Sequence, residues 1–334
     1  MLVREVVFAA ENEVEVRERE AELEPGPRQV LLRTHYSFVS TGTERAKLTG
    51  LQKIAYPWVA GNRAVAEVLA VGSEVADVKP GDKVLAHTPH VSHALTDGFR
   101  VAVPGTVPLQ QAAATVLALV AMTALRVSPP ELGDTVVVVG LGPVGLIAAQ
   151  LYEAAGVTVV GVDRDQGRLD LAHRLKISHG VLASSDGTLR SVREVTGPEG
   201  ARIVIEATGI PSVVPQCFDF ARQGGDLVLL GSPRGAEVVD VTPILERMHL
   251  WRPHCSVTVK GAHEWRFPPY RTPFNRHSME ENAQAIFALI ARGKLDLSRV
   301  IDHVVPAGEA PFAYERLRTD PGKWSGILFD WTAA

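Results

Sequence analysis

Cysteine is nearly absent from this chain of 334 residues, which contains only Cys217 and Cys255. Two cysteines without a Cys-x-x-Cys pair exclude a disulfide framework and a four-cysteine zinc lobe. Positive charge is not in excess either, because 34 Lys and Arg face 38 Asp and Glu, and a net charge of −4 does not attract nucleic acid. The first residues lack the apolar run of a secretion signal, and the apolar run 112–125 is too short to span a bilayer. These absences predict a cytoplasmic protein with neither a nucleic-acid nor a membrane partner.

A glycine-rich turn near the middle of the chain is the most informative feature that is present. Residues 135–139 read Thr-Val-Val-Val-Val, a β-branched run that predicts a strand buried on both faces. Gly140, Gly142 and Gly145 follow as G-x-G-x-x-G. Pro143 suits the first turn of a helix, because its missing N–H costs nothing there.

The helix predicted after this turn, whose apolar stripe starts at Val144, offers free N–H groups and the positive end of its dipole to a phosphate. Gly140 permits the tight turn, Gly142 lets the backbone approach a pyrophosphate, and Gly145 lets helix and strand pack closely. A second predicted strand ends in Asp163, where an acid can accept hydrogen bonds from ribose hydroxyls. The combination predicts a dinucleotide site, against the alternative of a tight strand–helix turn without a ligand.

The residues after the second strand bear on the choice of dinucleotide. Asp163 favours NAD(H), because its carboxylate repels the 2′-phosphate of NADP(H). Arg164 and Arg168 act in the opposite direction, since both can bind a phosphate, although Arg168 also fits a solvated helix face. We expect NAD(H), with NADP(H) as the less favoured cofactor.

The pattern of the chain indicates an α/β protein with two domains. Residues 1–121 are β-rich, with turns at the spacing of a small, partly open barrel. From Asp134 onward strands and helices alternate, as in a doubly wound parallel sheet. We predict strands at 13–22, 29–37, 64–71, 83–86, 135–139, 157–162, 202–207, 226–231 and 257–260, and helices at 110–126, 167–175, 188–195, 211–221 and 278–292. Residues 266–277 are either a surface loop or part of a substrate wall, and the tail from 300 returns to strand character.

Several short motifs resemble those of the medium-chain dehydrogenase/reductase family, and the resemblance extends over nearly the whole chain. The motifs are VGSEV at 71–75, VKPGDKV at 78–84, EATG at 206–209, LLGS at 229–232 and HVVP at 303–306. The resemblance implies a GroES-like catalytic domain made of residues 1–121 and 275–334, and a Rossmann domain, 122–274, inserted between them. It also implies a small-molecule substrate, cofactor contacts from Thr208 and Gly231, and a homodimer or homotetramer that joins Rossmann sheets edge to edge.

Zinc members of this family supply a cysteine, then His-Glu after a glycine, then a cysteine or aspartate. The corresponding positions here are Ser40, Asn62 after Gly61, and Leu119, and a hydroxyl, an amide and a leucine do not hold zinc. Where the structural zinc lobe would stand there are three histidines instead. These are His87, His90 and His93, spaced by three residues. They are candidates for a metal site or for substrate contact, or they are loop residues without a functional role. We expect a zinc-free member of the family, with no metal site.

Without zinc, a carbonyl has to be polarised by hydrogen-bond donors or a protonated side chain. Near the first zinc position, Glu44 is a candidate for the alcohol proton, and Thr43, Thr41 and Asn62 are candidates for bonds to the reacting oxygen. The alternative is that Glu44 is a helix-start acid that pairs with Arg45 or Lys47. A pairing with Arg63 would hold Glu44 ionised and favour a role as a base. His263 and Glu264 follow the last predicted Rossmann strand, and His263 is a further candidate for proton transfer.

These features predict an NAD(H)-dependent, zinc-independent oxidoreductase that acts on an alcohol or carbonyl, such as a polyol or sugar derivative. The first alternative is an NADPH-dependent quinone or enone reductase of the same family. The second is a dinucleotide-binding protein without catalysis. The motif at 40–44 is also similar to bacteriochlorophyll-pathway dehydrogenases, which oxidise a hydroxyethyl side chain.

Overall fold

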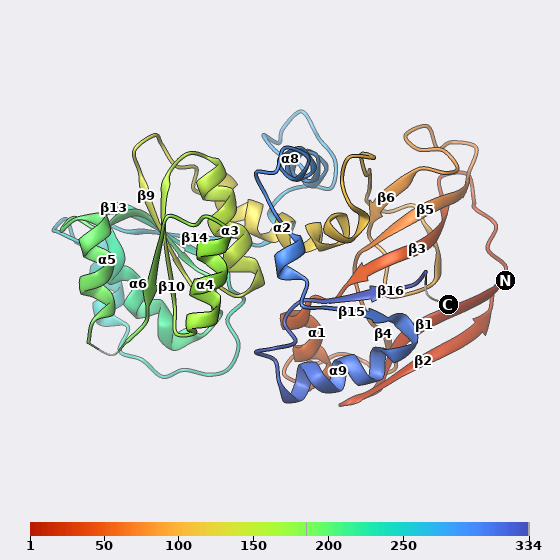
Figure 1. Ribbon diagram of the computed structural model, residues 1–334, viewed down its shortest axis with the longest axis horizontal. Helices are drawn as coiled ribbons and strands as arrows, with labels where there is room; N and C mark the ends of the chain where they lie inside the picture. Colours follow the sequence, from red (N-terminus) through yellow and green to blue (C-terminus); the bar gives the residue numbers. More distant parts are fainter. Residues whose placement is uncertain (185, 333–334) are drawn as a thin grey trace. The chain divides into compact units, whose positions relative to one another are not determined.

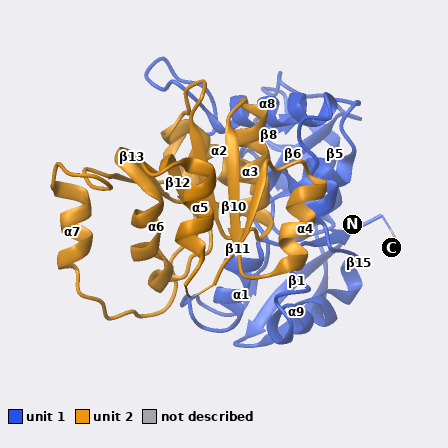
Figure 2. Cartoon of the chain, turned by 60° about the vertical axis from the view of Figure 1, so that its left-hand side comes forward, with its two compact units in different colours: residues 1–116, 269–334 blue, residues 117–268 orange. Residues whose placement is uncertain are grey.

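The computed structural model describes residues 1–184 and 186–332, and the chain divides into two compact units (Figure 2). Unit 1 comprises Met1–Val116 and Pro269–Ala334, and unit 2 is Leu117–Pro268. The sequence-based boundaries stand after residue 121 and after residue 274. In chain order, unit 2 is one continuous segment that interrupts unit 1.

Unit 1 is built from two mainly antiparallel sheets (Figure 1). A small sheet has the order β2-β1-β4, and a larger one has the order β15-β16-β3-β5-β6-β8, with β7 pairing with β3. Its strands are β1 (Leu2–Ala10), β2 (Glu13–Glu20), β3 (Val30–Phe38), β4 (Trp58–Val59), β5 (Ala64–Val71), β6 (Lys83–Ala86), β7 (His93–Thr96), β8 (Arg100–Ala102), β15 (His303–Pro306) and β16 (Ile327–Asp330). Two apolar clusters fill the unit, one around Phe8, Tyr314 and Phe329 and the other between β3, β5 and β6.

The helices of unit 1 are α1 (Thr41–Leu48), α8 (Met279–Ala291) and α9 (Ala310–Thr319), with short 3₁₀ turns η3 (Ser298–Val300) and η4 (Ala307–Glu309). Two of these helices, α1 and α9, carry the candidates Thr43 and Glu44 and the buried Tyr314. The predicted capping box of α8 is confirmed, because the Ser278 hydroxyl accepts from Glu281 N and the Glu281 side chain accepts from Ser278 N. The prediction of strand character for the whole tail is wrong at α9, a helix whose buried stripe contains Ala313, Tyr314 and Leu317.

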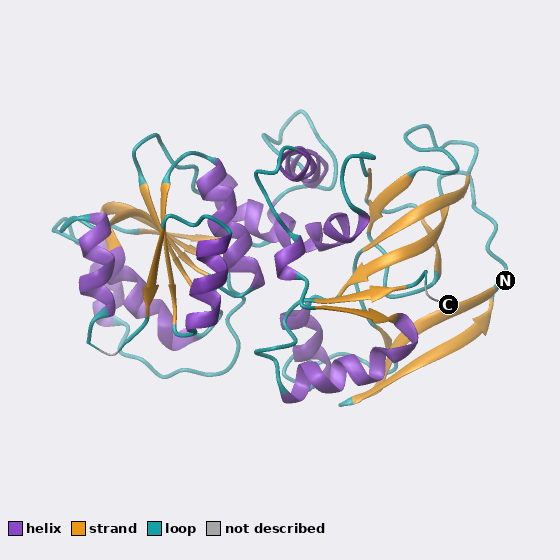
Figure 3. Ribbon diagram, in the orientation of Figure 1, coloured by secondary structure: helices purple, strands orange, loops and turns teal. Residues whose placement is uncertain are grey.

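Unit 2 is a six-stranded parallel sheet of order β11-β10-β9-β12-β13-β14. Helices α3 and α4 lie on one side of the strands and α5 and α6 on the other (Figure 3). The strands are β9 (Thr135–Val139), β10 (Thr158–Asp163), β11 (His179–Leu182), β12 (Ala201–Glu206), β13 (Ala221–Leu229) and β14 (Thr258–Gly261). The helices are α3 (Pro143–Ala154), α4 (Gln166–Arg174), α5 (Thr188–Thr196), α6 (Val214–Phe220) and α7 (Thr242–His249), with 3₁₀ turns η1 (Pro211–Val213) and η2 (Glu264–Arg266). The predicted α/β class, with a doubly wound sheet beside a β-rich domain, is confirmed.

Two differences from the predicted elements have clear causes. Strand β13 starts at Ala221 rather than at residue 226, because Gly224 and Gly225 form an irregularity within the strand that hides its first residues from a periodicity argument. Helix α7 was not predicted, since Ile244 packs on the core of unit 2 but every residue of the helix is at least partly exposed.

Helix α2 (Leu109–Val127) begins in unit 1 and ends in unit 2. Among the described helices it alone is long and apolar enough to cross a membrane by length and composition. In this protein 67% of its most apolar stretch is buried, and the core helix of a folded domain passes the same test.

Candidate functional site

The glycine turn of unit 2 joins β9 to α3 in a conformation that other residues would not permit. Gly140 has φ +92°, in the left-handed region. Gly142 is the N-cap of α3, and Pro143 and Val144 open the helix. A Cβ on Gly145 would lie 1.8 Å from the carbonyl oxygen of Gly140, so the helix can approach the turn this closely only with glycine there. Around Gly142, by contrast, a Cβ would find open space, which leaves room for a ligand group.

Asp163 ends β10 beside this turn, and its carboxylate is held in place by backbone groups. One oxygen accepts from Leu141 N at 2.7 Å, and the other accepts from Asp165 N at 2.9 Å. The guanidinium of Arg168 stands 3.5 Å from the same carboxylate, whereas Arg164 is exposed. The side chain of Asp163 is only 4% exposed, so it is fixed before any ligand binds.

The ends of β12 and β13 complete this edge of the sheet. A Cβ on Gly140 would touch Cγ2 of Thr208 at 2.7 Å, and one on Gly231 would meet Gly209 N at 2.2 Å. The structure therefore brings together, at the carboxyl ends of four parallel strands, all the residues predicted to contact the cofactor: Gly140, Gly142, Pro143, Val144, Gly145, Asp163, Arg164, Arg168, Thr208 and Gly231. In doubly wound sheets, ligands bind at this edge.

Glu206 organises the same edge and was not singled out as a site residue from the sequence. Its carboxylate is 1% exposed and accepts from Thr208 N at 2.7 Å, from Gly209 N at 3.1 Å and from the Thr208 hydroxyl. Burial raises the pKa of Glu206, although the hydrogen bonds from Thr208 and Gly209 oppose that rise. Its place in the EATG motif was the available signal, but the sequence does not reveal that the side chain folds back onto its own loop.

In unit 1, Glu44 lies inside the core rather than at a surface. The residue is 2% exposed. One carboxylate oxygen accepts from Ser40 N at 2.7 Å, and the other contacts His90 Nε2 at 3.1 Å and accepts from the Tyr314 hydroxyl. Burial favours a raised pKa for Glu44, but the charge and hydrogen bond of His90, with the bonds from Tyr314 and Ser40, outweigh it and lower that pKa. The hydrogen bonds of the Glu44 side chain are made with these three residues. Of the expected charge partners, Lys47 interacts with Glu44, whose charge raises the Lys47 pKa against the larger effect of burial.

The Glu44 contacts continue through His90 to the end of the chain. His90 Nδ1 is 2.8 Å from Ser37 Oγ, and Trp331 Nε1 donates to the same oxygen at 2.8 Å. Ser37, His90 and Tyr314 are 0% exposed. We call Tyr314, Glu44, His90, Ser37 and Trp331 the buried network.

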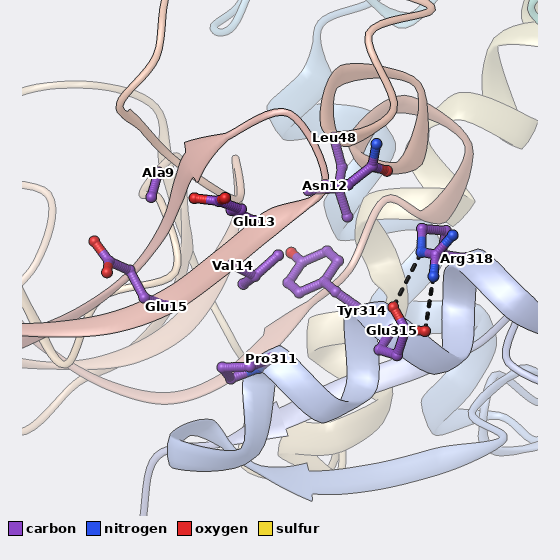
Figure 4. Close-up of a pocket in the computed structure, with 10 residues that line it drawn as sticks. All are labelled: Ala9, Asn12, Glu13, Val14, Glu15, Leu48, Pro311, Tyr314, Glu315 and Arg318. Atoms are coloured by element: carbon purple, nitrogen blue, oxygen red, sulfur yellow. Dashed lines mark hydrogen bonds and ion pairs between the residues drawn. The ribbon is translucent and has the colours of Figure 1, made fainter.

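A pocket of about 350 Å³ lies over one end of the buried network, between β2 and α9 (Figure 4). Its lining includes Glu13, Glu15 and Tyr314, and its Arg318 is already bonded to Glu315. Because Tyr314 has no exposed surface, this pocket does not open the network to solvent.

The other candidates of unit 1 surround the first turn of α1. The Thr41 hydroxyl donates to Ser325 O at 3.2 Å, which connects the first turn of α1 to the segment just before β16. Within the described part of the chain, the Thr43 hydroxyl and the Asn62 amide have no hydrogen-bond partner, and Asn62 is exposed. Arg63 is 1% exposed and buried beside the turn that carries Asn62.

His263 belongs to unit 2, where it is exposed and forms the N-cap of η2. Its Nδ1 accepts weakly from Trp265 N at 3.4 Å. Its neighbour Glu264 is 9% exposed. Of the four candidates for catalysis, the structure thus places Glu44, Thr43 and Asn62 in unit 1 and His263 in unit 2.

The expected zinc positions hold the side chains of Ser40, Asn62 and Leu119. Within residues 1–184 and 186–332, no group of three or more His, Cys, Asp or Glu side chains is placed to hold a metal ion. The three closely spaced histidines have different neighbours: His90 contacts Glu44 and Ser37, His87 packs on Phe99 with ring centroids 4.8 Å apart, and His93 contacts Ser92. Burial and the charge of Arg63 lower the pKa of His87 to about 3, so that ring is neutral at physiological pH. A hydroxyl, an amide and a leucine side chain are not among the nitrogen, sulfur and carboxylate ligands that zinc takes in proteins.

Two family models match the chain. Residues 26–107 match the alcohol dehydrogenase GroES-like domain, and residues 143–265 match the zinc-binding dehydrogenase model. The first falls in unit 1 and the second in unit 2.

The curated relatives are dehydrogenases at low identity. An L-threonine 3-dehydrogenase of Saccharopolyspora erythraea is 28% identical over 61% of this chain and 53% of that protein, so the match spans about half of its length. An L-threonine 3-dehydrogenase of Bacillus subtilis is 27% identical over 80% of this chain and 81% of that protein. A D-guloside 3-dehydrogenase of Escherichia coli is 27% identical over 76% of this chain and 72% of that protein.

Solved structures share the fold over nearly the full length. Galactitol-1-phosphate dehydrogenase of Escherichia coli superposes with a TM-score of 0.85 at 18% identity, covering 98% of this chain and 99% of that one. A protein of Sinorhizobium meliloti that is named a zinc-binding dehydrogenase, solved with NADP, gives 0.82 at 21% identity and 99% coverage of both chains. The family models, the relatives and this shared fold show that the chain belongs to the medium-chain dehydrogenase/reductase family of NAD(P)-dependent oxidoreductases.

Proposed function

We propose that this protein is an NAD(H)-dependent oxidoreductase that interconverts an alcohol and a carbonyl without a catalytic zinc ion. The observation that carries the proposal is the Asp163 carboxylate, fixed 2.7 Å from Leu141 N within the glycine turn. A carboxylate held at this point accepts the two hydroxyls of an adenosine ribose and repels a 2′-phosphate. Arg168 forms an ion pair with that carboxylate, so the positive charge of Arg168 is partly neutralised within the protein.

The cradle for the dinucleotide is supported by the glycines. Gly142 leaves open space where a Cβ would stand, and the first N–H groups of α3 are available to a pyrophosphate. When bound, the nicotinamide supplies or accepts the hydride. The protein's own part is to bind and orient the cofactor through Gly140, Gly145, Thr208 and Gly231.

Zinc independence rests on the donor set, since Ser40 and Asn62 supply a hydroxyl and an amide where zinc members have metal ligands. The reacting oxygen then needs hydrogen-bond donors. We assign this role to the Thr43 hydroxyl and the Asn62 amide, which have no partner within the described residues. His263, exposed and with one nitrogen available, is the group we assign to the proton.

The substrate we propose is a hydroxyl-rich small molecule such as a polyol or sugar derivative. The names of two relatives support this class, because they state dehydrogenation at position 3 of threonine and of a guloside. A likeness in fold to a quinone oxidoreductase of Pseudomonas syringae, with a TM-score of 0.79 at 20% identity, makes enone and quinone reduction the alternative to be tested.

The deciding experiment is calorimetric titration of metal-analysed protein with NADH and then NADPH. We expect at least about tenfold tighter binding of NADH, which corresponds to roughly 1.4 kcal/mol, and less than stoichiometric zinc. Polyols and secondary alcohols with NAD⁺ are then the substrates to screen. Preference for NADPH would reassign Arg164 and Arg168 to the 2′-phosphate and move the screen to enones and quinones. Tight NADH binding without turnover of any substrate would indicate a dinucleotide-binding protein without catalysis.

We also propose that the protein forms a homo-oligomer through unit 2. Strand β14 stands at the end of the sheet order, so it presents an edge that a second copy can extend. Close to it in the chain, α7 and its N-cap expose apolar side chains at the spacing of one helix face: Val241 56%, Leu245 57% and Met248 42%. Trp251, beyond the end of the helix, is 80% exposed. Apolar surface of this kind marks an interface.

Replacing Leu245 by aspartate is expected to convert the oligomer to monomer at micromolar concentration, because the charge would be buried against its own copy. Light scattering after size-exclusion chromatography measures the mass. Leu51→Asp is the matched control, since Leu51 is 68% exposed in unit 1 and its replacement leaves the oligomer intact. A wild-type protein that elutes as a monomer would refute the interface.

A further inference from the structure

The hydrogen bonds of the buried network run in one direction. The indole N–H of Trp331 can only donate, so Ser37 Oγ accepts it. His90 Nδ1 lies 2.8 Å from the same oxygen and accepts from the Ser37 hydroxyl when it carries no proton. His90 Nε2–H in turn donates to Glu44 at 3.1 Å, and the Tyr314 hydroxyl donates to the same oxygen. Every donor in the network has an acceptor, and every bond leads to the Glu44 carboxylate.

This arrangement restricts where His90 carries a proton. A ring with its only proton on Nδ1 would leave Nε2 facing Glu44 without a proton, and Glu44 would lose a hydrogen bond. The geometry therefore places a proton on His90 Nε2.

The same bonds occupy Glu44 fully. Its first oxygen accepts from Ser40 N, its second accepts from His90 and Tyr314, and the residue is 2% exposed. A carboxylate in this setting has no route by which a substrate hydroxyl can reach it. What Glu44 does contact is the N-cap of α1, where Ser40 N is one of the backbone donors that a helix start leaves without a partner.

We propose that Glu44 is a positioning residue: it holds the first turn of α1, and with it the Thr43 hydroxyl, instead of taking the proton of the substrate. The turn is fixed at three points, by Glu44 on Ser40 N, by Thr41 on Ser325 O, and by Glu44 N on Ser40 O at 2.8 Å. Thr43 lies between these anchors. The role of Thr43 toward the reacting oxygen rests on the proposed function, whereas the direction of the network does not.

The state of His90 is read directly by long-range ¹H–¹⁵N correlation spectra of the full-length protein labelled at its 11 histidines. His90→Gln identifies the resonance. We expect a proton on Nε2 of His90. A ring whose only proton is on Nδ1 would overturn the proposed direction. This measurement needs no substrate, so it separates failure of the network from failure of the proposed function.

The kinetic test uses Tyr314→Phe, which removes one hydrogen bond to Glu44 and changes little else. Removing a hydrogen bond from a carboxylate raises its pKa, so an acidic limb of the kcat profile that belongs to Glu44 has to move to higher pH in this variant. We expect kcat to fall severalfold, KM to change less, and the limb to stay in place.

Glu44→Gln provides the second arm of the kinetic test. A proton-transferring carboxylate would lose roughly 10²- to 10⁴-fold in kcat and lose its limb in the pH profile. A positioning residue keeps the limb while kcat falls in parallel with Tyr314→Phe. Glu315→Gln, an exposed carboxylate one residue along α9 from Tyr314, is the matched control and leaves both parameters unchanged. A limb that shifts in Tyr314→Phe and disappears in Glu44→Gln would refute the proposal.

Discussion

Replacing Gly145 by alanine is expected to abolish detectable NADH binding, with a loss of roughly 100-fold or more, or about 3 kcal/mol. The added Cβ would stand 1.8 Å from the carbonyl oxygen of Gly140 and 3.0 Å from its carbonyl carbon. Both atoms are backbone, so the start of α3 has to move away from the turn. The N–H groups that would meet the pyrophosphate move with it. Calorimetric titration with NADH measures the loss, and thermal unfolding measures the accompanying destabilisation of about 1–3 kcal/mol.

Two other glycines separate the causes of this effect. The Cβ that Gly142→Ala adds meets no atom within 4 Å, so we expect an unchanged unfolding temperature. This variant weakens NADH binding only if the cofactor itself occupies that space. Gly308→Ala in unit 1 also meets nothing and changes neither quantity. Wild-type NADH affinity in Gly145→Ala would show that the cofactor does not bind at this turn.

The fold of unit 2 was predictable because its signals are local. Strand β9, the glycine turn and the start of α3 lie within about a dozen consecutive residues. The spacing of the three glycines in the sequence is enough to predict why each position needs a residue without a side chain. The capping box of α8 is local in the same way, with Ser278 and Glu281 three residues apart. Helix α9 also carried a local signal, since Ala310, Ala313, Tyr314 and Leu317 recur at helical spacing, but the neighbouring strand pattern obscured it.

The buried network could not be predicted, because its members come from distant parts of the chain. Glu44 and Tyr314 are 270 positions apart, and Ser37 and Trp331 are 294 apart. The sequence showed that Glu44 is an acid at a helix start and that His90 is one of three spaced histidines. It could not show that the two meet in a core, since only the packing of α1, α9 and β3 decides this. The acid near the first zinc position was therefore interpreted as a candidate for the alcohol proton.

Glu44→Gln is expected to lower the free energy of unfolding by roughly 2–4 kcal/mol at neutral pH, because it leaves buried donors without an acceptor. The amide can keep the bond from Ser40 N through its oxygen. Its NH₂ group then faces two donors, His90 Nε2–H and the Tyr314 hydroxyl, which both lose their partner. Urea unfolding measures the loss. Tyr314→Phe removes one donor together with its need for an acceptor and costs about 1–2 kcal/mol, and the exposed Glu315→Gln changes stability by less than about 0.5 kcal/mol.

The pH dependence of this difference follows from the lowered pKa of Glu44. The titratable groups around it are His90, Tyr314 and, along α1, Lys47. A carboxylate whose pKa is lower in the folded protein than its ordinary value of 4.5 stabilises the fold fully above that value, and the contribution is lost as pH falls through the folded pKa. The gap between wild type and Glu44→Gln is therefore expected to be constant from pH 8 to about pH 5 and to shrink in more acidic solution. A gap that grows on acidification would mean that Glu44 is protonated in the native protein, and the network would then have to run in the opposite direction.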